Sequence, residues 1–175
     1  YIYNADGHDE NSLIDVLING NLTVHKYAVS SGYSGLEIKN SSVNGDTVVN
    51  NVGNDFGDTK TIIDNSKLEG SGVTAALAIY NPYGNNIVEV RPNTQLGRGG
   101  FVGAQPVVYI SNLGGGSRTT FTGANQIAGP GTTTVYGAIE INNGDNPLNT
   151  VDIVTFNLVN VLGEVQLTNN EGSTQ

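Results

Sequence analysis

Two acidic runs hold the side chains whose types and spacing could do chemistry, and that chemistry is the binding of a divalent cation. The residues are Asp6, Asp9 and Glu10 in the first run, and Asp46, Asn54, Asp55 and Asp58 in the second. Calcium takes about six to eight oxygen ligands from carboxylates, amides and backbone carbonyls. Neither run has EF-hand spacing, and Asp and Asn also occupy turns for conformational reasons. Calcium is therefore the one cofactor that we predict, and turn formation is the alternative role of these residues.

Side chains suited to catalysis are few. The chain has 2 histidines, His8 in an acidic segment and His25 in a β-prone segment, and no cysteine. It contains no Gly-x-Ser-x-Gly elbow. The glycine-rich run over residues 97–103 lacks the Lys-Ser or Lys-Thr pair of a phosphate loop, and no helical pattern follows it. The 16 acidic residues offer many carboxylate pairs, so a pair alone does not indicate a glycosidase. We therefore predict that the protein is not an enzyme.

The charge of the chain argues against nucleic acid as a partner. The formal net charge is -9, and only 7 residues are basic. A phosphate-binding surface needs clustered Lys and Arg, which this sequence lacks. No apolar run approaches the roughly 18 residues that a membrane-spanning helix needs. We expect neither a nucleic-acid partner nor a membrane span.

The sequence starts at Tyr1 and contains no methionine. We interpret this as removal of a secretory leader, with a trimmed chain as the alternative. The lack of cysteine does not place the protein inside the cell, because many secreted prokaryotic proteins also lack it. The expected location is therefore extracellular or at the cell surface. Asn21 and Asn40 each begin a glycosylation sequon, and whether either is modified stays open.

Short β-strands are the elements that must position these side chains. Glycine is frequent, at 24 residues, and charged residues make up only 13%. Apolar and polar residues alternate in segments bounded by Gly, Asn, Asp or Pro, and we find neither a helical period nor a repeat of fixed length. Asn19-Gly20 and Gly163-Glu164 each predict a tight hairpin. The sequence thus predicts an all-β fold, namely an antiparallel two-sheet sandwich of the Ig-like or jelly-roll-like kind.

This pattern divides the chain into an N-terminal extension (1–11), a sandwich domain (12–168) and a polar tail (169–175). The predicted core includes Leu77, Ile79, Val135, Ile139, Ile153 and Val159. Tyr1, Ile2 and Tyr3 are apolar and β-prone, and acidic residues separate them from the first hairpin. Such an end can fold back on its own sheet or add a strand to the sheet edge of a neighbour. We favour donation to a neighbour, which makes these three the predicted assembly residues.

Three turn motifs carry a resemblance to a known group. They are an apolar strand followed by Asn-Pro at residues 79–82, Gly-Pro-Gly-Thr-Thr-Thr at residues 129–134, and a Gly-centred hairpin at residues 162–165. With them, about half of the chain resembles the secreted β-sandwich subunits of prokaryotic surface fibres, of the biofilm-fibre and camelysin type or of archaeal bundling pili and cannulae. The resemblance implies assembly by a donated strand and, in some cases, calcium at subunit contacts. The N-terminus departs from the biofilm-fibre pattern, so the resemblance does not identify the donor strand.

These observations favour a non-enzymatic structural subunit of an extracellular filament, tube or surface layer. Its partners would be copies of itself, joined by β-strand addition and stabilised by calcium. The alternative is a carbohydrate-binding or adhesin module, in which Tyr80 and Tyr83 would stack on a glycan. A viral capsid or decoration protein is a third interpretation.

Overall fold

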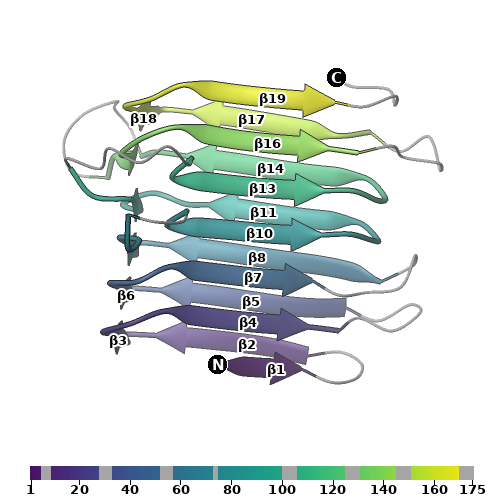
Figure 1. The fold of residues 1–175 in the computed structure, drawn as a ribbon, viewed down its shortest axis with the longest axis horizontal. Coiled ribbons are helices and arrows are strands. Elements are labelled where there is room, and N and C mark those ends of the chain that lie inside the picture. The colour runs from purple at the N-terminus through teal and green to yellow at the C-terminus, as the bar shows by residue number, and fades with distance from the viewer. Residues whose placement is uncertain are drawn as a thin grey trace.

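The chain winds into a coil in which each strand lies beside the strand one coil further along (Figure 1). The computed structural model describes residues 1–4, 9–27, 33–51, 57–72, 75–99, 106–124, 131–144 and 151–169. Within these residues the coils build three sheets, called A, B and C here, of 7, 6 and 6 strands. Every pairing among the described strands is parallel. The architecture is a parallel β-solenoid.

Each coil contributes one strand to each sheet in turn. Sheet A contains β1 (Ile2–Asn4), β4 (Leu22–Lys26), β7 (Thr47–Asn51), β10 (Leu77–Asn81), β13 (Val108–Asn112), β16 (Ile139–Asn143) and β19 (Val165–Asn169). Sheet B contains β2 (Asp9–Ile14), β5 (Tyr33–Lys39), β8 (Asp58–Asp64), β11 (Asn86–Val90), β14 (Ser117–Thr122) and β17 (Ile153–Asn157). Sheet C contains β3 (Leu17–Ile18), β6 (Ser42–Val43), β9 (Lys67–Leu68), β12 (Gln95–Leu96), β15 (Thr133–Val135) and β18 (Val159–Val161).

Columns of identical burial run along the solenoid because residues in register on successive strands face the same way. Val24, Val49, Ile79, Ile110 and Ile141 form one such column in sheet A, and all are fully buried. Sheets B and C add further columns, and together they make one continuous apolar core. The period-2 alternation of the sequence is therefore the inside–outside alternation of each strand.

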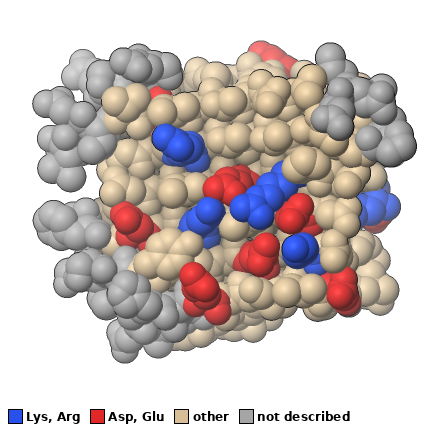
Figure 2. Space-filling model, turned by 180° about the vertical axis from the view of Figure 1, so that it is seen from behind, with Lys and Arg blue, Asp and Glu red and all other residues tan. Residues whose placement is uncertain are grey.

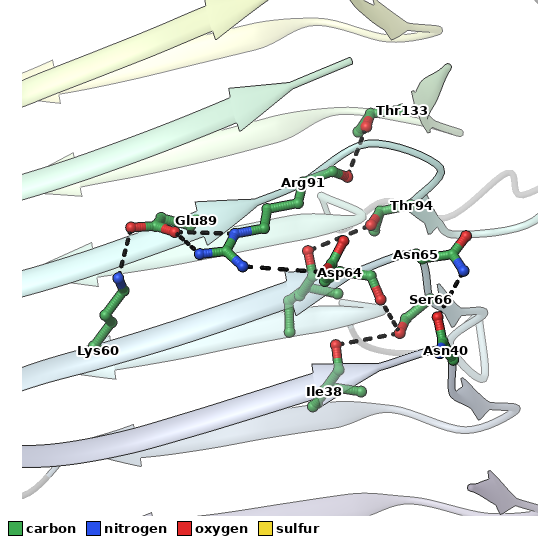
Figure 3. A network of polar contacts seen from close by, with 11 residues as sticks. Ile38, Asn40, Lys60, Asp64, Asn65, Ser66, Glu89, Arg91, Thr94 and Thr133 are labelled. Atoms are coloured by element: carbon green, nitrogen blue, oxygen red, sulfur yellow. Dashed lines mark hydrogen bonds and ion pairs between the residues drawn. The ribbon is translucent and has the colours of Figure 1, made fainter. Parts of the chain in front are cut away.

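The corner between sheets B and C depends on residues that tolerate a left-handed backbone. Asp15, Asn40, Asn65 and Asn93 occupy this corner in successive coils with φ of 57°, 49°, 45° and 61°. Asn and Asp adopt this conformation at lower cost than most residues. Asn65 Nδ2 donates to Asn40 Oδ1 at 2.7 Å, and Ser66 Oγ donates to the carbonyl oxygen of Ile38 at 3.2 Å (Figure 3). Adjacent coils are thus joined at the corner by side chains as well as by backbone.

The predicted antiparallel sandwich is wrong, although the all-β class is confirmed. The two predicted hairpins are corners of the coil: Asn19 and Gly20 connect β3 to β4, and Gly163 connects β18 to β19, so the flanking strands belong to different sheets. Neither Asn19 nor Gly20 has the positive φ of a type I′ turn. Glycine is needed for space at Gly163, where a Cβ would lie 2.3 Å from a backbone carbon of Gly137 in the coil below, whereas a Cβ on Gly20 would meet no atom within 4 Å.

The predicted core is confirmed at four of its positions. Leu77, Ile79, Val135 and Ile139 are fully buried. Ile153 and Val159 are only half-buried, because β17 and β18 are edge strands with no described coil above them. Val159 still packs against the core cluster. No described residue belongs to a helix, and accordingly none of the described segments is a helix that could cross a membrane.

Candidate assembly interface

Both ends of the solenoid present sheet edges, and these are the most unusual surfaces of the described molecule. We call the outer edges of β1, β2 and β3 the N-terminal edge, and those of β17, β18 and β19 the C-terminal edge (Figure 1). A sheet edge carries unpaired N–H and C=O groups that can pair with another strand. Natural edges are usually protected by charges, proline, bulges or a covering segment.

The C-terminal edge lacks most of these protections. Between Ile153 and Asn169 the only charged residue is Glu164, and there is no proline. Several of its apolar side chains lie in register with core residues but are open to solvent. Phe156 has 36% of its surface exposed, and Leu167 has 46%. The other large exposed apolar side chains of this end are Val151, Leu158, Leu162 and Val165. An apolar edge with a single charged residue, on a chain of net charge -9, is a candidate contact surface.

The N-terminal edge is more polar but also presents apolar side chains to solvent. Ile14 and Leu17 are exposed, at 49% and 62%, while Leu13 and Ile18 are half-buried against the core. β2 begins with Asp9 and Glu10, which place acidic residues on the edge of sheet B. Because all strands are parallel and stacked in register, the N-terminal edge of one copy presents the pattern that would follow the C-terminal edge of another.

A ladder of asparagines runs along sheet A and stops at the C-terminal edge. Asn51 Nδ2 donates to Asn81 Oδ1, and the same contact links Asn81 to Asn112 at 2.6 Å and Asn112 to Asn143 at 2.9 Å. Asn143 Nδ2 then donates to Asn169 Oδ1 at 2.9 Å. Each amide from Asn51 to Asn143 donates to the next, while the buried Asn51 Oδ1 at the start of the ladder accepts no hydrogen bond from the described residues. The ladder thus fixes the register of successive coils. Asn169 takes part through its oxygen.

Lys26 precedes Asn51 in the same column, with Asn4 of β1 as its register partner on the other side, and Lys26 is fully buried. Its Nζ donates to the carbonyl oxygen of Lys60 at 2.9 Å and to Thr61 Oγ1 at 3.2 Å. No carboxylate among the described residues pairs with it, since every described ion pair involves another cation. Burial therefore lowers the pKa of Lys26 to about 7. Near neutral pH the interior next to the N-terminal edge holds a lysine that is only partly charged.

The outer face of sheet B carries most of the described charge network. Basic and acidic side chains interleave on this face (Figure 2). Glu89 accepts from Lys60 at 2.8 Å and from Arg91 at 2.7 Å, and Arg91 lies 4.0 Å from Asp64 (Figure 3). Burial acts to raise the pKa of Glu89, but the hydrogen bonds from Lys60 and Arg91 outweigh it, and the pKa falls below its ordinary value. This network joins sheet B strands and leaves no open cluster of acids there.

The predicted metal ligands do not meet in the described part of the molecule. Asp46 directly precedes β7 of sheet A, whereas Asp58 is the first residue of β8 in sheet B. Asp46 accepts from the backbone N–H and hydroxyl of Ser71 at 2.7 and 2.9 Å, and Asp58 accepts from Asn85 at 2.9 Å. Among the residues with defined positions, no group of three potential metal ligands forms.

The other predicted metal ligands cannot be compared in the same way. Asp6, Asn54, Asp55 and the side chain of Asp9 lie outside the described part of the chain, and Glu10 is exposed on β2. Calcium binding stays a prediction.

The predicted assembly residues form an edge strand on their own chain. Ile2 pairs with Val24 and Tyr3 with His25, so β1 extends sheet A next to β4. Ile2 packs against the core, while Tyr1 and Tyr3 are exposed and contact the rings of His25 and Tyr27. This placement is the fold-back alternative for the N-terminus, and donation to a neighbour stays a prediction.

The sequence analysis missed the C-terminal edge, although the nearly charge-free run of residues 153–169 was a visible signal.

The predicted glycan-binding tyrosines lie on the outer side of the same solenoid. Tyr80 is exposed on sheet A and contacts Tyr109 of the next coil, with ring centroids 5.6 Å apart. Tyr83 is exposed in the turn that follows β10. The sequon residues Asn21 and Asn40 are both exposed at corners, where Asn21 Oδ1 accepts from the Asp46 backbone N–H.

No family model, curated protein or solved structure matches the chain. The resemblance to surface-fibre subunits is therefore untested by comparison, and function has to be argued from the geometry.

Proposed function

We propose that this protein is a non-enzymatic structural subunit whose copies join end to end, by β-strand addition, into an extracellular filament, tube or surface layer. The observation that carries the proposal is the pair of edges left by the described strands, which are parallel and carry exposed apolar side chains at both ends. Joining them is a head-to-tail contact, and such a contact repeats without closing unless its rotation forms a ring. Backbone pairing supplies affinity, and the core columns that continue across the joint supply specificity.

Charge substitution at the C-terminal edge tests this proposal. Leu167 continues a buried column of sheet A, whereas its neighbour Gln166 faces outward. We expect Leu167→Lys to remain folded but to lose assembly, because a charge would be buried at the joint. Gln166→Lys is the matched control and should assemble like the native chain. Sedimentation velocity over a concentration series measures this. A native chain that stays monomeric at all concentrations, or equal behaviour of the two variants, would contradict end-to-end joining.

Calcium enters the proposal as a factor that promotes assembly. Subunits of net charge -9 repel one another, and cations reduce that repulsion. Calcium chloride should therefore be compared with sodium chloride at equal ionic strength. A specific site predicts stronger assembly in calcium and a higher midpoint of thermal unfolding, reversed by a chelator. Equal effects of the two salts would reduce the role of calcium to screening.

A glycan-binding role is the second candidate, and the tyrosines of sheet A favour it. Tyr80 and Tyr109 lie side by side on an outer face that is rich in Asn, Ser and Thr. Aromatic faces and amide groups are suited to sugar rings and hydroxyls. A glycan array probed with the native chain and with Tyr80→Ala tests this role, which predicts binding that the substitution abolishes. Absence of binding to any glycan would remove it.

A further inference from the structure

Sheet A has one strand more than the other two sheets. From β2 to β19 the chain makes complete coils in the order B, C, A, so these strands alone give six in each sheet. The additional strand is β1, which lies on the outer edge of β4. β1 therefore lies in sheet A one coil before β4, and no described strand of sheet B or C lies at the same level.

β1 covers its neighbour only in part. It pairs with Val24, His25 and Lys26, and no described strand pairs with Leu22 and Thr23 of the five-residue β4 on that side. Two of its side chains are largely in solvent, with Tyr1 at 78% and Tyr3 at 56% exposure. β19 is five residues long and pairs over its whole length with β16. A strand like β19 would thus match β4 completely, whereas β1 matches it over three residues.

We infer that β1 is a displaceable cap and that the strand which replaces it on β4 is β19 of a second copy of this chain. The inference rests on the proposed end-to-end function and specifies its geometry. With β1 displaced, β19 meets β4, β17 meets β2 and β18 meets β3 of the next copy, and all three sheets continue without a gap. The cap keeps a separate subunit from exposing the full edge of sheet A.

The side chains that meet in this arrangement continue the core in every sheet. When the register is followed from coil to coil, Leu167 of one copy lies next to Val24 of the other copy in sheet A. In sheet B, Phe156 of the first copy lies next to Leu13 of the second copy. In sheet C, Val161 of the first copy lies next to Ile18 of the second copy. Sheets B and C each gain one apolar pair, while sheet A exchanges the Ile2–Val24 pair for a Leu167–Val24 pair. The joint would cover Leu167, Phe156 and the other half-buried apolar side chains at the two edges.

Keeping β1 in place gives a poorer joint. β19 would then pair with β1, which has only three residues, and sheet A would contain one strand level that the described strands of sheets B and C do not fill. The edges of β17, β18, β2 and β3 would keep their unpaired backbone groups inside the contact. Unpaired backbone groups shielded from water are costly, so displacement of β1 is the favoured arrangement.

A reversible lock on β1 tests the inference. Tyr3 and His25 are register partners on the outer face, and adjacent strands bring Cα atoms about 4.7–4.9 Å apart, within the range of a disulfide. The native chain has no cysteine, so Tyr3→Cys with His25→Cys should form a single bond that holds β1 on β4. We expect loss of assembly under oxidation and recovery on reduction. The control lock, Asn50→Cys with Tyr80→Cys, joins β7 to β10 and should assemble in both states.

Cross-linking between copies gives the register directly. Tyr3, His25 and Thr168 share one outward column. Displacement predicts that a His25→Cys chain mixed with a Thr168→Cys chain forms a cross-linked dimer, and that Tyr3→Cys with Thr168→Cys does not. The reverse result, or assembly of the oxidised Tyr3–His25 lock, would overturn the cap while leaving end-to-end joining intact. A reduced chain that never assembles would overturn both.

Discussion

Phe121 and Phe156 stack in consecutive strands of sheet B, with ring centroids 5.0 Å apart and planes inclined by 13°, yet only one of them is enclosed. Phe121 is fully buried, whereas Phe156 keeps 36% of its surface exposed. The difference arises because β17 is the edge strand and nothing described lies on its far side. The core of the solenoid thus continues to the C-terminal edge and remains open there.

This relationship predicts different effects of truncating the two rings. Phe121→Ala should lower the free energy of unfolding by about 3–5 kcal/mol, as a large cavity in a closed core does. Phe156→Ala should cost clearly less in the monomer, because water can fill the space that it leaves. Denaturant unfolding at low protein concentration measures both. Equal losses would show that the edge is covered in solution.

The asparagine ladder predicts a position-dependent cost. Asn112→Ala removes the acceptor of Asn81 and the donor to Asn143, and each buried amide left without its partner costs about 1–3 kcal/mol. Asn169→Ala affects only Asn143, so its cost should be about half as large. Thermal unfolding of the two variants tests the ladder, and a neutral Asn112→Ala would show that these amides do not hold the coils together.

The corner between sheets B and C predicts a reciprocal pair of substitutions. Leu158 occupies this corner in the final coil with φ of 55°, a conformation that costs a branched L-residue about 1–2 kcal/mol. Leu158→Asn should therefore stabilise the monomer. Asn65→Leu should destabilise it, because it introduces the same strain and removes the 2.7 Å bond to Asn40. Opposite signs in chemical unfolding would support this account of the corner, and equal signs would contradict it.

Lys26 predicts a pH dependence of stability. Its pKa is about 7 in the folded chain and near the ordinary 10.5 when unfolded, so between these values the unfolded state binds more protons. The free energy of unfolding should rise with pH across this window, by up to about 1.4 kcal/mol per pH unit from this group. Lys26→Met should remove that rise. Unfolding of both chains from pH 6 to 10 measures the difference, and parallel profiles would mean that Lys26 titrates normally.

The sequence was sufficient for the strands and for much of the core, but not for the way the strands pair. Alternation places Leu77 and Ile79 inside in a sandwich and in a solenoid alike, because both bury one face of each strand. Glycine corners resemble hairpin turns when only local residues are considered.

Unequal coil lengths concealed the repeat. Successive ladder asparagines, from Asn51 to Asn169, are separated by 30, 31, 31 and 26 residues, so no fixed period appears. The 25-residue separation of Asn40 and Asn65 was the clearest available signal. The additional strand of sheet A could not be identified without the fold, because it becomes visible only when strands are assigned to sheets.

The axial rise per subunit in a filament, measured by cryo-electron microscopy, tests the central claim most directly. Joining with β1 displaced advances the filament by six strand spacings, or about 29 Å at roughly 4.8 Å each. Joining with β1 retained would advance it by seven spacings, or about 34 Å. The account predicts the shorter rise, with strands perpendicular to the filament axis. A rise of seven spacings would contradict the cap, and a chain that forms no filament under any salt or calcium condition would contradict end-to-end assembly itself.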